Sequence, residues 1–85
     1  MVTVYLLQSE LDGTNYVGMT EHLLRRIEEH NQGKSKFTAG HRPWKLVYSE
    51  TAPDFSSGRV KEKYFKSAAG KKYIQKKLSE GSLPD

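Results

Sequence analysis

The sequence predicts a small α/β (α+β) protein in which a three-stranded antiparallel sheet is flanked by helices in a single domain. Its 85 residues suit one domain, and a chain of this size buries roughly 60–65% of the surface that it exposes when unfolded. Runs rich in β-branched and aromatic residues at 2–8, 15–19 and 44–50 predict the three strands. Apolar residues spaced three and four apart in the segments between and after them predict helices that pack on the sheet.

The first two strands are expected to form an antiparallel hairpin. They are separated by the polar segment SELDGT, in which Asp12-Gly13 is a turn signal. In such a hairpin Tyr5 and Tyr16 come from neighbouring strands, and both can project toward the start of the next helix. A single tyrosine in a strand more often packs in the core than takes part in chemistry. Two tyrosines beside a helix that carries Arg and His favour a functional role.

The segment YVGMTEHLLRRIEEHN is expected to run from a strand directly into an amphipathic helix. Its glycine, Gly18, is typical of a strand that ends before a sharp turn, and Thr20 is the expected N-cap of the helix. Leu23, Leu24 and Ile27 then form an apolar stripe at three- and four-residue spacing. This stripe is expected to face the core.

One edge of this helix carries side chains suited to chemistry. Arg26 and His30 lie four residues apart on the same edge, whereas Arg25 points almost oppositely, into solvent. Beside the end of a strand that carries Tyr16, this edge brings together a cation, an imidazole and a phenol. Such groups can bind and position a phosphate.

The segment that follows the helix is expected to be an exposed loop. Gly33 supplies the helix stop, and residues 34–43 are polar, basic and closed by Pro43. This loop is either a simple solvated connection or a segment that lies along a phosphate backbone. Trp44, which begins the third strand, can stack on a base, although a single Trp at a strand start is more often a core anchor.

The third strand is expected to alternate between two faces. Its pattern places one apolar set on one side and a mixed set on the other. The first set is Trp44, Leu46 and Tyr48, and the second is Lys45, Val47 and Ser49.

The last third of the chain predicts a helix at 58–67, a break at 68–70 and a short C-terminal helix. In the first of these helices, Val60 and Tyr64 are expected on one face beside Phe65.

Glu62 on the helix at 58–67 has two interpretations, which the helix itself leaves open. It is a surface acid in helical ion pairs, each worth about 0.2–0.5 kcal/mol, or a carboxylate at the rim of the core that binds a divalent cation. We place the whole domain at 1–79 and expect a frayed C-terminal tail at 80–85.

Positive charge is concentrated in the second half of the chain. The formal net charge is +4, and between residues 59 and 77 a series of cations is interrupted only by one acid. This pattern favours a polyanionic partner, although a solvated helix face produces it equally well. Candidate nucleic-acid-binding residues in the loop and in this series are Lys34, Lys36, Arg42, Lys61 and Lys66.

Other classes of protein are not indicated. The chain contains no cysteine, which excludes a disulfide framework and a thiolate metal site. No apolar run approaches the ~18 residues of a membrane span, and the N-terminus lacks the pattern of a signal peptide. We therefore expect a cytoplasmic protein that does not bind membranes.

The order of these residues resembles the GIY-YIG nuclease domain. Tyr5 is followed by the YVG of the second strand, then by Arg26 and His30 on one helix edge, and then by an acid on a later helix. The stretches VYLL, YVGMT, LLRRIEEHNQGKSKFT, RPWKLVY and VKEKYFKS look like those of the small stand-alone bacterial members of that family. The resemblance runs from about residue 2 to residue 78, and the ordered set is more specific than any single motif.

The resemblance implies metal-dependent hydrolysis of a phosphodiester in DNA. Carried over by position, Tyr5 and Tyr16 match the tyrosines of the two motifs. Arg26 matches the family arginine, and His30 matches the histidine one turn later. Glu62 matches the metal-binding glutamate. One Mg²⁺ or Mn²⁺ ion at Glu62 is the implied cofactor. Tyr5 is the candidate general base and Tyr16 positions the water or the phosphate, although the two can exchange roles. His30 then orients a tyrosine or shuttles a proton.

The sequence departs from the family pattern at two places. The first motif reads Thr3-Val4-Tyr5 in place of Gly-Ile-Tyr, and no asparagine is found near the C-terminus, where family members often carry one. The length leaves no room for a separate DNA-recognition domain, so selection by nucleic-acid structure, or by a targeting partner protein, is expected. Single-stranded, branched and damaged DNA are the candidate substrates, and a monomer is expected.

A second hypothesis is a non-catalytic nucleic-acid-binding or partner-docking module that retains the fold. The presence of all five candidate catalytic residues together favours the enzyme, because a degenerate module is expected to have lost at least one. DNA and RNA are not distinguished by the sequence.

Overall fold

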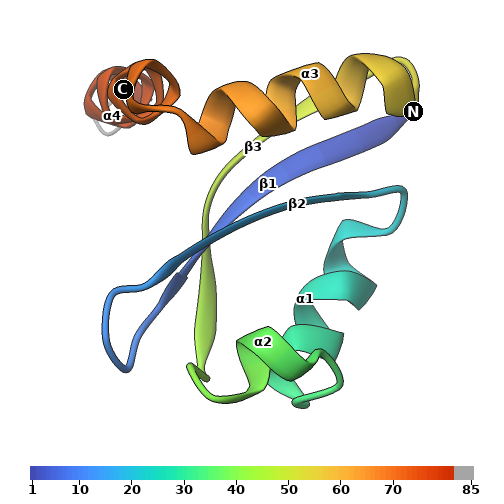
Figure 1. Ribbon diagram of the computed structural model, residues 1–85, viewed down its shortest axis with the longest axis vertical. Coiled ribbons are helices and arrows are strands. Elements are labelled where there is room, and N and C mark those ends of the chain that lie inside the picture. The colour runs from blue at the N-terminus through green and yellow to red at the C-terminus, as the bar shows by residue number, and fades with distance from the viewer. Residues whose placement is uncertain (82–85) are drawn as a thin grey trace.

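Three antiparallel strands form one sheet in the order β2-β1-β3, with helices on both of its faces (Figure 1). The computed structural model describes residues 1–81. Its elements in chain order are β1 (Val2–Ser9), β2 (Asn15–Thr20), α1 (Leu23–Asn31), α2 (Lys36–Ala39), β3 (Trp44–Ala52), α3 (Phe55–Lys66) and α4 (Ala68–Gly81). The predicted fold class, a three-stranded antiparallel sheet flanked by helices, is confirmed.

The predicted hairpin joins β1 and β2 through a tight turn at Asp12 and Gly13. Gly13 has a φ of 79°, and the Asp12 carboxylate accepts a hydrogen bond from the Thr14 amide at 3.0 Å. A positive φ is readily adopted by glycine, which has no Cβ. The register that follows pairs Tyr5 with Gly18 and Leu7 with Tyr16. Because side chains alternate along strands, Tyr5 and Tyr16 lie on the same face of the sheet.

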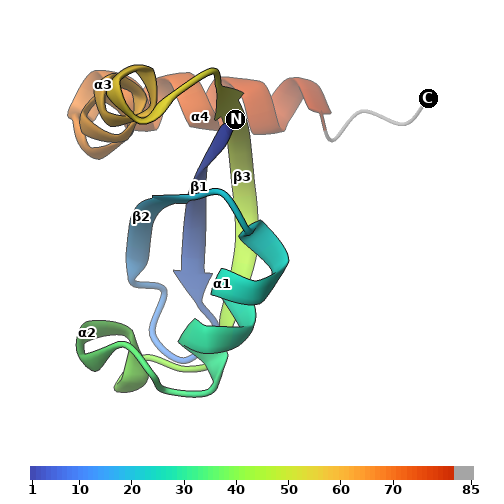
Figure 2. The same ribbon diagram turned by 90° about the vertical axis from the view of Figure 1, so that its right-hand side faces the viewer.

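The two faces of the sheet carry two separate apolar clusters. Val4, Leu6 and Val17 pack with Phe65 of α3 and Ile74 of α4 on one face. On the other face the cluster consists of Tyr5, Leu7 and Trp44, against which Tyr16, Leu23 and Ile27 pack. Figure 2 shows α3 and α4 crossing one end of the sheet, while α1 and α2 lie toward the other. The burial of Trp44, which is 3% exposed, confirms its interpretation as a core anchor.

The predicted alternation of β3 is wrong after Leu46 because the strand contains an irregularity. Leu7 pairs with Leu46 but Leu6 pairs with Tyr48, so Val47 is an extra residue in the ladder. Val47 and Tyr48 both pack on the cluster beneath α3 and α4, and Leu46 is 42% exposed. An inserted residue shifts every later side chain to the opposite face.

The start of α1 also differs from the prediction. β2 continues through Gly18 to Thr20, and the helix begins at Leu23 with His22 as a cap residue that makes no side-chain capping bond. Thr20 accepts a hydrogen bond from the His22 amide before the helix starts, so it is not the N-cap. Leu24 is 79% exposed and lies outside the core.

The predicted exposed loop after α1 contains a short helix. Gly33 has a φ of 82° and ends the preceding helix as expected. α2 then brings Thr38 into the interior, where it is fully buried. The helix therefore contributes to the interior as well as to the surface.

α3 begins three residues earlier than predicted, at Phe55, because Asp54 caps it by accepting a hydrogen bond from the Ser57 amide. Its apolar face is also different: Phe65 is buried, but Val60 is 70% and Tyr64 42% exposed.

The break that separates α3 from α4 lies at Ser67, and α4 begins at Ala68. A Cβ at Gly70 would lie 1.7 Å from the Tyr64 carbonyl oxygen, so only glycine permits this approach. α4 continues to Gly81, two residues beyond the expected end of the domain, and the rest of the expected tail, 82–85, lies outside the described residues.

A polar cluster ties α3 and α4 to β3. Glu50 accepts hydrogen bonds from the Lys61 ammonium at 2.7 Å, from the Tyr73 hydroxyl at 2.6 Å and from the Tyr48 hydroxyl. Burial acts to raise the pKa of Glu50, but the three hydrogen bonds outweigh this effect and lower the pKa to about 2. The carboxylate is therefore stabilised by folding.

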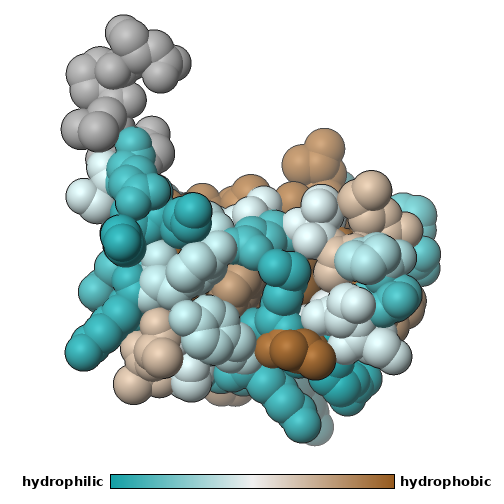
Figure 3. Space-filling view, turned by 90° about the horizontal axis from the view of Figure 1, so that it is seen from above, coloured by the Kyte–Doolittle hydropathy of each residue, from teal (hydrophilic) through white to brown (hydrophobic). Residues whose placement is uncertain are grey.

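The outer surface of α3 and α4 is mainly hydrophilic, with isolated apolar side chains (Figure 3). None of the helices in the described part of the chain is long and apolar enough to span a membrane.

Candidate active site

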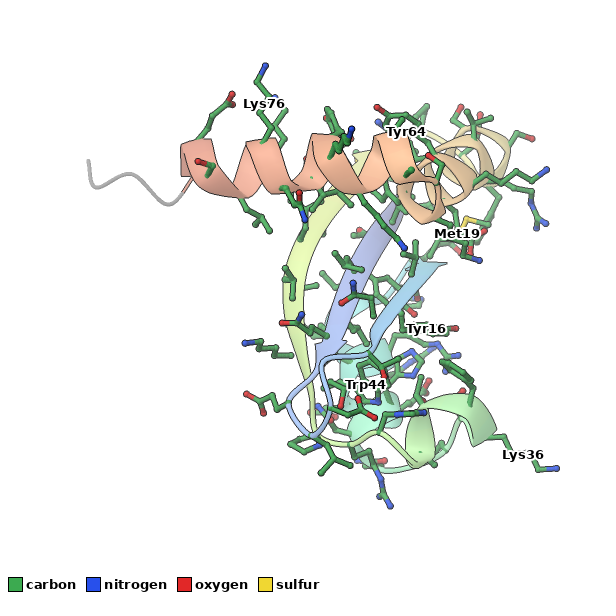
Figure 4. The ribbon with its side chains drawn as sticks, turned by 60° about the vertical axis from the view of Figure 1, so that its left-hand side comes forward. Tyr16, Met19, Lys36, Trp44, Tyr64 and Lys76 are labelled. Atoms are coloured by element: carbon green, nitrogen blue, oxygen red, sulfur yellow. The ribbon has the colours of Figure 1, made fainter. Side chains whose placement is uncertain are left out.

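Four of the five candidate catalytic residues meet between α1 and the face of the sheet that it covers. Tyr5 is 1% exposed and His30 is fully buried. The Tyr16 ring lies 5.0 Å from the His30 ring and 6.4 Å from the Tyr5 ring, measured between centroids. Figure 4 shows Tyr16 and Trp44 near the same end of the sheet, and their rings are 6.3 Å apart.

The glycine of the YVG segment makes room for both tyrosines. A Cβ at Gly18 would lie 2.6 Å from the Tyr5 hydroxyl oxygen and 3.1 Å from the Tyr16 ring. Gly18 pairs directly with Tyr5 across the hairpin. The space that the tyrosines need therefore explains this glycine, and β2 runs through it to Thr20, one residue beyond the predicted strand at 15–19.

A buried chain of hydrogen bonds runs from Tyr5 through His30 to Thr38. The Tyr5 hydroxyl lies 3.1 Å from His30 Nε2, and His30 Nδ1 lies 2.8 Å from the Thr38 hydroxyl. Thr38 uses its one hydrogen toward the Ser35 carbonyl at 3.4 Å, so it accepts from His30 Nδ1–H. His30 Nε2 is then unprotonated and accepts the hydrogen of the Tyr5 hydroxyl.

The protonation states of Tyr5 and His30 fit this chain. Burial raises the pKa of Tyr5 to about 12 with a further contribution from Tyr16, while the positive charge of Arg26 acts in the opposite direction. Burial lowers the pKa of His30 below its usual value, and Arg26 lowers it further. Near neutral pH the tyrosine is protonated and the imidazole is a neutral acceptor of its hydrogen.

Arg26 is held at the site by an acid of its own helix. Its guanidinium donates a hydrogen bond to Glu29 at 2.9 Å, and its side chain is 35% exposed. This bond raises the pKa of Arg26. A guanidinium has five N–H donors, so the remaining ones can bind an anion beside Tyr5. Arg25 has a 70% exposed side chain and points into solvent, as expected.

Glu62 approaches the same residues from α3. Its negative charge contributes to the raised pKa of Tyr5, which shows that the carboxylate is within electrostatic reach of that hydroxyl. The side chain is 21% exposed, and its nearest ion pair, with Lys66, is long at 3.7 Å. The helical ion pair with Lys66 is therefore present, and the role of Glu62 as a metal ligand stays a prediction.

The Glu62 carboxylate suits a magnesium or manganese ion as one ligand among several. Within residues 1–81 no three His, Cys, Asp or Glu side chains gather to hold a metal. Mg²⁺, however, is usually held by one or two carboxylates, and water and substrate phosphate complete its shell. A half-buried carboxylate near groups that bind phosphate suits this mode.

The candidate nucleic-acid-binding residues do not all lie together. Lys34, Lys36 and Arg42 are exposed around α2, and Figure 4 shows Lys36 projecting away from the sheet. Arg42 uses its Nε to bond the Ala39 carbonyl at 2.8 Å, which leaves its other donors available. Lys61 is bound to Glu50 and serves the fold. Lys66 is the last residue of α3, where it pairs with Glu62 at 3.7 Å.

Sequence reasoning missed three residues that shape the site. Glu29 positions Arg26 through a hydrogen bond, and the three-residue spacing between them on one helix is a sequence pattern that indicates such a pair. Gly18 gives the tyrosines their space. Thr38 orients His30 across eight residues of chain, and no pattern in the sequence indicates such a contact.

Comparisons with known proteins identify the family of the chain. The family model described as GIY-YIG catalytic domain matches residues 1–77. A UPF0213 protein of Desulfotalea psychrophila is 43% identical over 61 residues, which cover 69% of this chain and 54% of that protein. A UPF0213 protein of Bacillus cereus is 41% identical over 69 residues, covering 76% of this chain and 72% of that protein.

Another UPF0213 protein, from Syntrophus aciditrophicus, is 35% identical over 74 residues, covering 85% of this chain and 84% of that protein. The chain thus spans about half of the first relative and most of the other two. No solved structure matches the chain. The family match extends from β1 into α4 and includes all five residues of the site, so the chain belongs to the GIY-YIG catalytic-domain family.

Proposed function

We propose that this protein is a metal-dependent endonuclease that hydrolyses phosphodiester bonds in DNA. The observation that carries the proposal is the hydrogen bond between the Tyr5 hydroxyl and a neutral His30, beside Arg26 and within reach of the charge of Glu62. This arrangement offers a proton acceptor, a phosphate-binding cation and a metal ligand in one place.

Tyr5 and His30 together act as the general base. The Tyr5 oxygen takes a proton from the attacking water while its own hydrogen passes to His30 Nε2, 3.1 Å away. The pKa of about 12 makes an isolated Tyr5 a poor source of phenolate near neutral pH. Transfer to His30 removes this difficulty, because the imidazole is neutral and oriented by Thr38.

Arg26 and Tyr16 hold the phosphate. The guanidinium presents paired donors to the non-bridging oxygens, on which negative charge grows in the transition state. Glu29 limits its motion through the 2.9 Å hydrogen bond. The Tyr16 hydroxyl makes no hydrogen bond to another described residue and is available to the water or the phosphate. The two tyrosines thus have different roles, set by their partners.

Glu62 is the proposed ligand of one Mg²⁺ or Mn²⁺ ion. When bound, such an ion stabilises the charge that develops on the leaving oxygen. The role of Glu62 is to hold that cation at the rim of the site, and the contribution of its negative charge to the raised pKa of Tyr5 supports this role.

The proposed substrate is recognised by DNA structure rather than by sequence, as in repair or recombination. The cations around α2 can follow a phosphate backbone without reading bases. A targeting partner protein, a monomeric state and a cytoplasmic location remain predictions.

The proposal is tested by a cleavage assay on labelled single-stranded, duplex and branched DNA, in Mg²⁺ and in EDTA. We compare the wild type with Tyr5→Phe, which removes one hydroxyl, and with the control Tyr64→Phe on an exposed helix face. Metal-dependent cleavage that Tyr5→Phe lowers by about 100-fold or more supports the proposal. DNA binding without cleavage by any of the three proteins refutes it and favours the non-catalytic binding module.

A further inference from the structure

The face of the sheet below α4 contains a groove that extends beyond the cluster of catalytic residues. Its volume is about 450 Å³, which lies within the roughly 300–1,000 Å³ of ligand pockets. Figure 2 shows α4 crossing only one end of the strands. The apolar part of the groove is formed by Leu6, Val17 and Val47 of the sheet and by Ile74 and Leu78 of α4.

Three amide side chains line the polar part of this groove. They are those of Gln8 on β1, Asn15 on β2 and Gln75 on α4. Within residues 1–81 none of the three makes a side-chain hydrogen bond to the protein. Each offers both donors and an acceptor, which is the combination that base edges require. The groove therefore presents unused hydrogen-bonding groups beside an apolar surface.

The charge in the groove is entirely positive. Lys66 and Lys71 are its charged lining residues, and Lys71 makes no ion pair with any described residue. Such a groove is complementary to a phosphate backbone.

The groove is continuous with the catalytic cluster through aromatic side chains. Tyr16 and Phe37 both line it, and their rings lie 5.9 Å apart with an angle of 33° between their planes. Phe37 is 57% exposed, which is unusual for a large apolar side chain unless it has a partner. An exposed ring beside a catalytic tyrosine can stack on a base next to the scissile phosphate.

We propose that this groove binds unpaired bases of a single DNA strand whose backbone passes Tyr16, so that the enzyme selects single-stranded or branched DNA. This inference rests on the proposed nuclease function and names its substrate class. Phe37 stacks on a base, the three amides contact base edges, and Lys66 and Lys71 contact phosphates. A base-paired duplex keeps its base faces stacked and its pairing edges occupied, so it cannot fill the groove in this way.

The test is the affinity of the protein for fluorescent oligonucleotides, measured by anisotropy in EDTA at physiological salt. The ligands are a single strand, an abasic strand of equal phosphate number and a duplex. Lys71→Glu is matched by Lys76→Glu, the same charge change on the same helix; Figure 4 shows Lys76 pointing away from the sheet. Phe37→Ala is matched by Phe55→Ala, a second exposed phenylalanine that lies on α3.

The inference predicts that Phe37→Ala weakens binding of the base-bearing strand about tenfold and leaves binding of the abasic strand within twofold. Lys71→Glu weakens binding of both strands at least about fivefold. Lys76→Glu changes it less than twofold, because Lys76 points away from the sheet and does not line the groove. Equal effects of the two lysine variants overturn the inference. So do equal affinities for base-bearing and abasic strands, as expected if the groove binds a peptide instead.

The outcome separates this inference from the nuclease proposal. Binding in EDTA does not depend on cleavage, so loss of affinity in Phe37→Ala without any metal-dependent cutting refutes only the nuclease. Metal-dependent cutting that all four variants perform like the wild type, with unchanged affinities, refutes only the groove.

Discussion

Gly18→Ala adds one methyl group at the point where the two strand tyrosines meet. The new Cβ would lie 2.6 Å from the Tyr5 hydroxyl oxygen, whereas ordinary contacts begin at 3.4 Å. The tyrosine must therefore move by about 0.8 Å or the two strands must separate. Because Tyr5 is buried and hydrogen-bonded to His30, neither adjustment is free.

The expected effects follow from this overlap. Inserting an extra carbon into a packed interior costs about 1–3 kcal/mol of unfolding free energy. A displacement of about 1 Å at a catalytic group can lower the rate about 100-fold. We therefore predict that Gly18→Ala lowers single-turnover cleavage by about 100-fold while most of the protein remains folded.

The assay combines urea denaturation with single-turnover cleavage of the best DNA substrate. The control is Gly40→Ala, because a Cβ at Gly40 meets nothing within 4 Å and its φ of −79° suits alanine. Cleavage by folded Gly18→Ala within threefold of the wild type would refute the requirement for a fixed Tyr5. Equal losses in both glycine variants would refute the assignment of the effect to this site.

Three further predictions concern the general base, the arginine that binds the phosphate and the stability of the fold. The pKa of His30 lies below its usual value, so the wild-type cleavage rate should be flat from about pH 7 to about pH 9. In His30→Gln the Tyr5 proton has no acceptor, so the rate should rise about tenfold per pH unit as the Tyr5 phenolate forms. Equal pH profiles would contradict proton transfer from Tyr5 to His30. Arg26→Ala should lower cleavage about 100- to 1,000-fold and Arg25→Ala less than twofold, and the reverse order would contradict the assignment of the helix edge. The folded-state pKa of Glu50 is about 2 against an ordinary 4.5, so its contribution of about 3 kcal/mol is present above pH 4.5 and is lost as pH falls toward 2. Urea denaturation should show this acid loss in the wild type and not in Glu50→Gln, and identical acid profiles would refute it.

The strands could be predicted from the sequence because their signals are local. Alternating β-branched and aromatic residues around Asp12 and Gly13 indicate a hairpin without knowledge of the rest of the chain. The shared face of Tyr5 and Tyr16 follows from that pairing. The family resemblance then supplied the order of the remaining site residues.

The helix faces could not be predicted as well. Periodicity identifies an apolar stripe but not its length, and each helix here covers only one end of a small sheet. Leu24 and Val60 belong to apolar stripes by spacing but remain 79% and 70% exposed. The irregularity at Val47 adds one residue to a strand, which the alternation pattern does not reveal.

The support of the site depends on contacts between distant segments. His30 and Thr38 are buried polar residues that bond to each other, and His30 also bonds to Tyr5, so their polar groups are satisfied in the interior. A hydrophobicity pattern places both residues on the surface. Their burial is visible only when α1, α2 and β1 are assembled.

The proposed nuclease is tested most directly by the effect of Glu62 on metal binding and cleavage. Mn²⁺ binding by calorimetry and cleavage of DNA are measured for the wild type, for Glu62→Ala and for Glu28→Ala, an exposed glutamate on α1. If Glu62 holds the metal, Glu62→Ala loses both metal binding and cleavage while Glu28→Ala keeps both. Unchanged metal binding and cleavage in Glu62→Ala would contradict it.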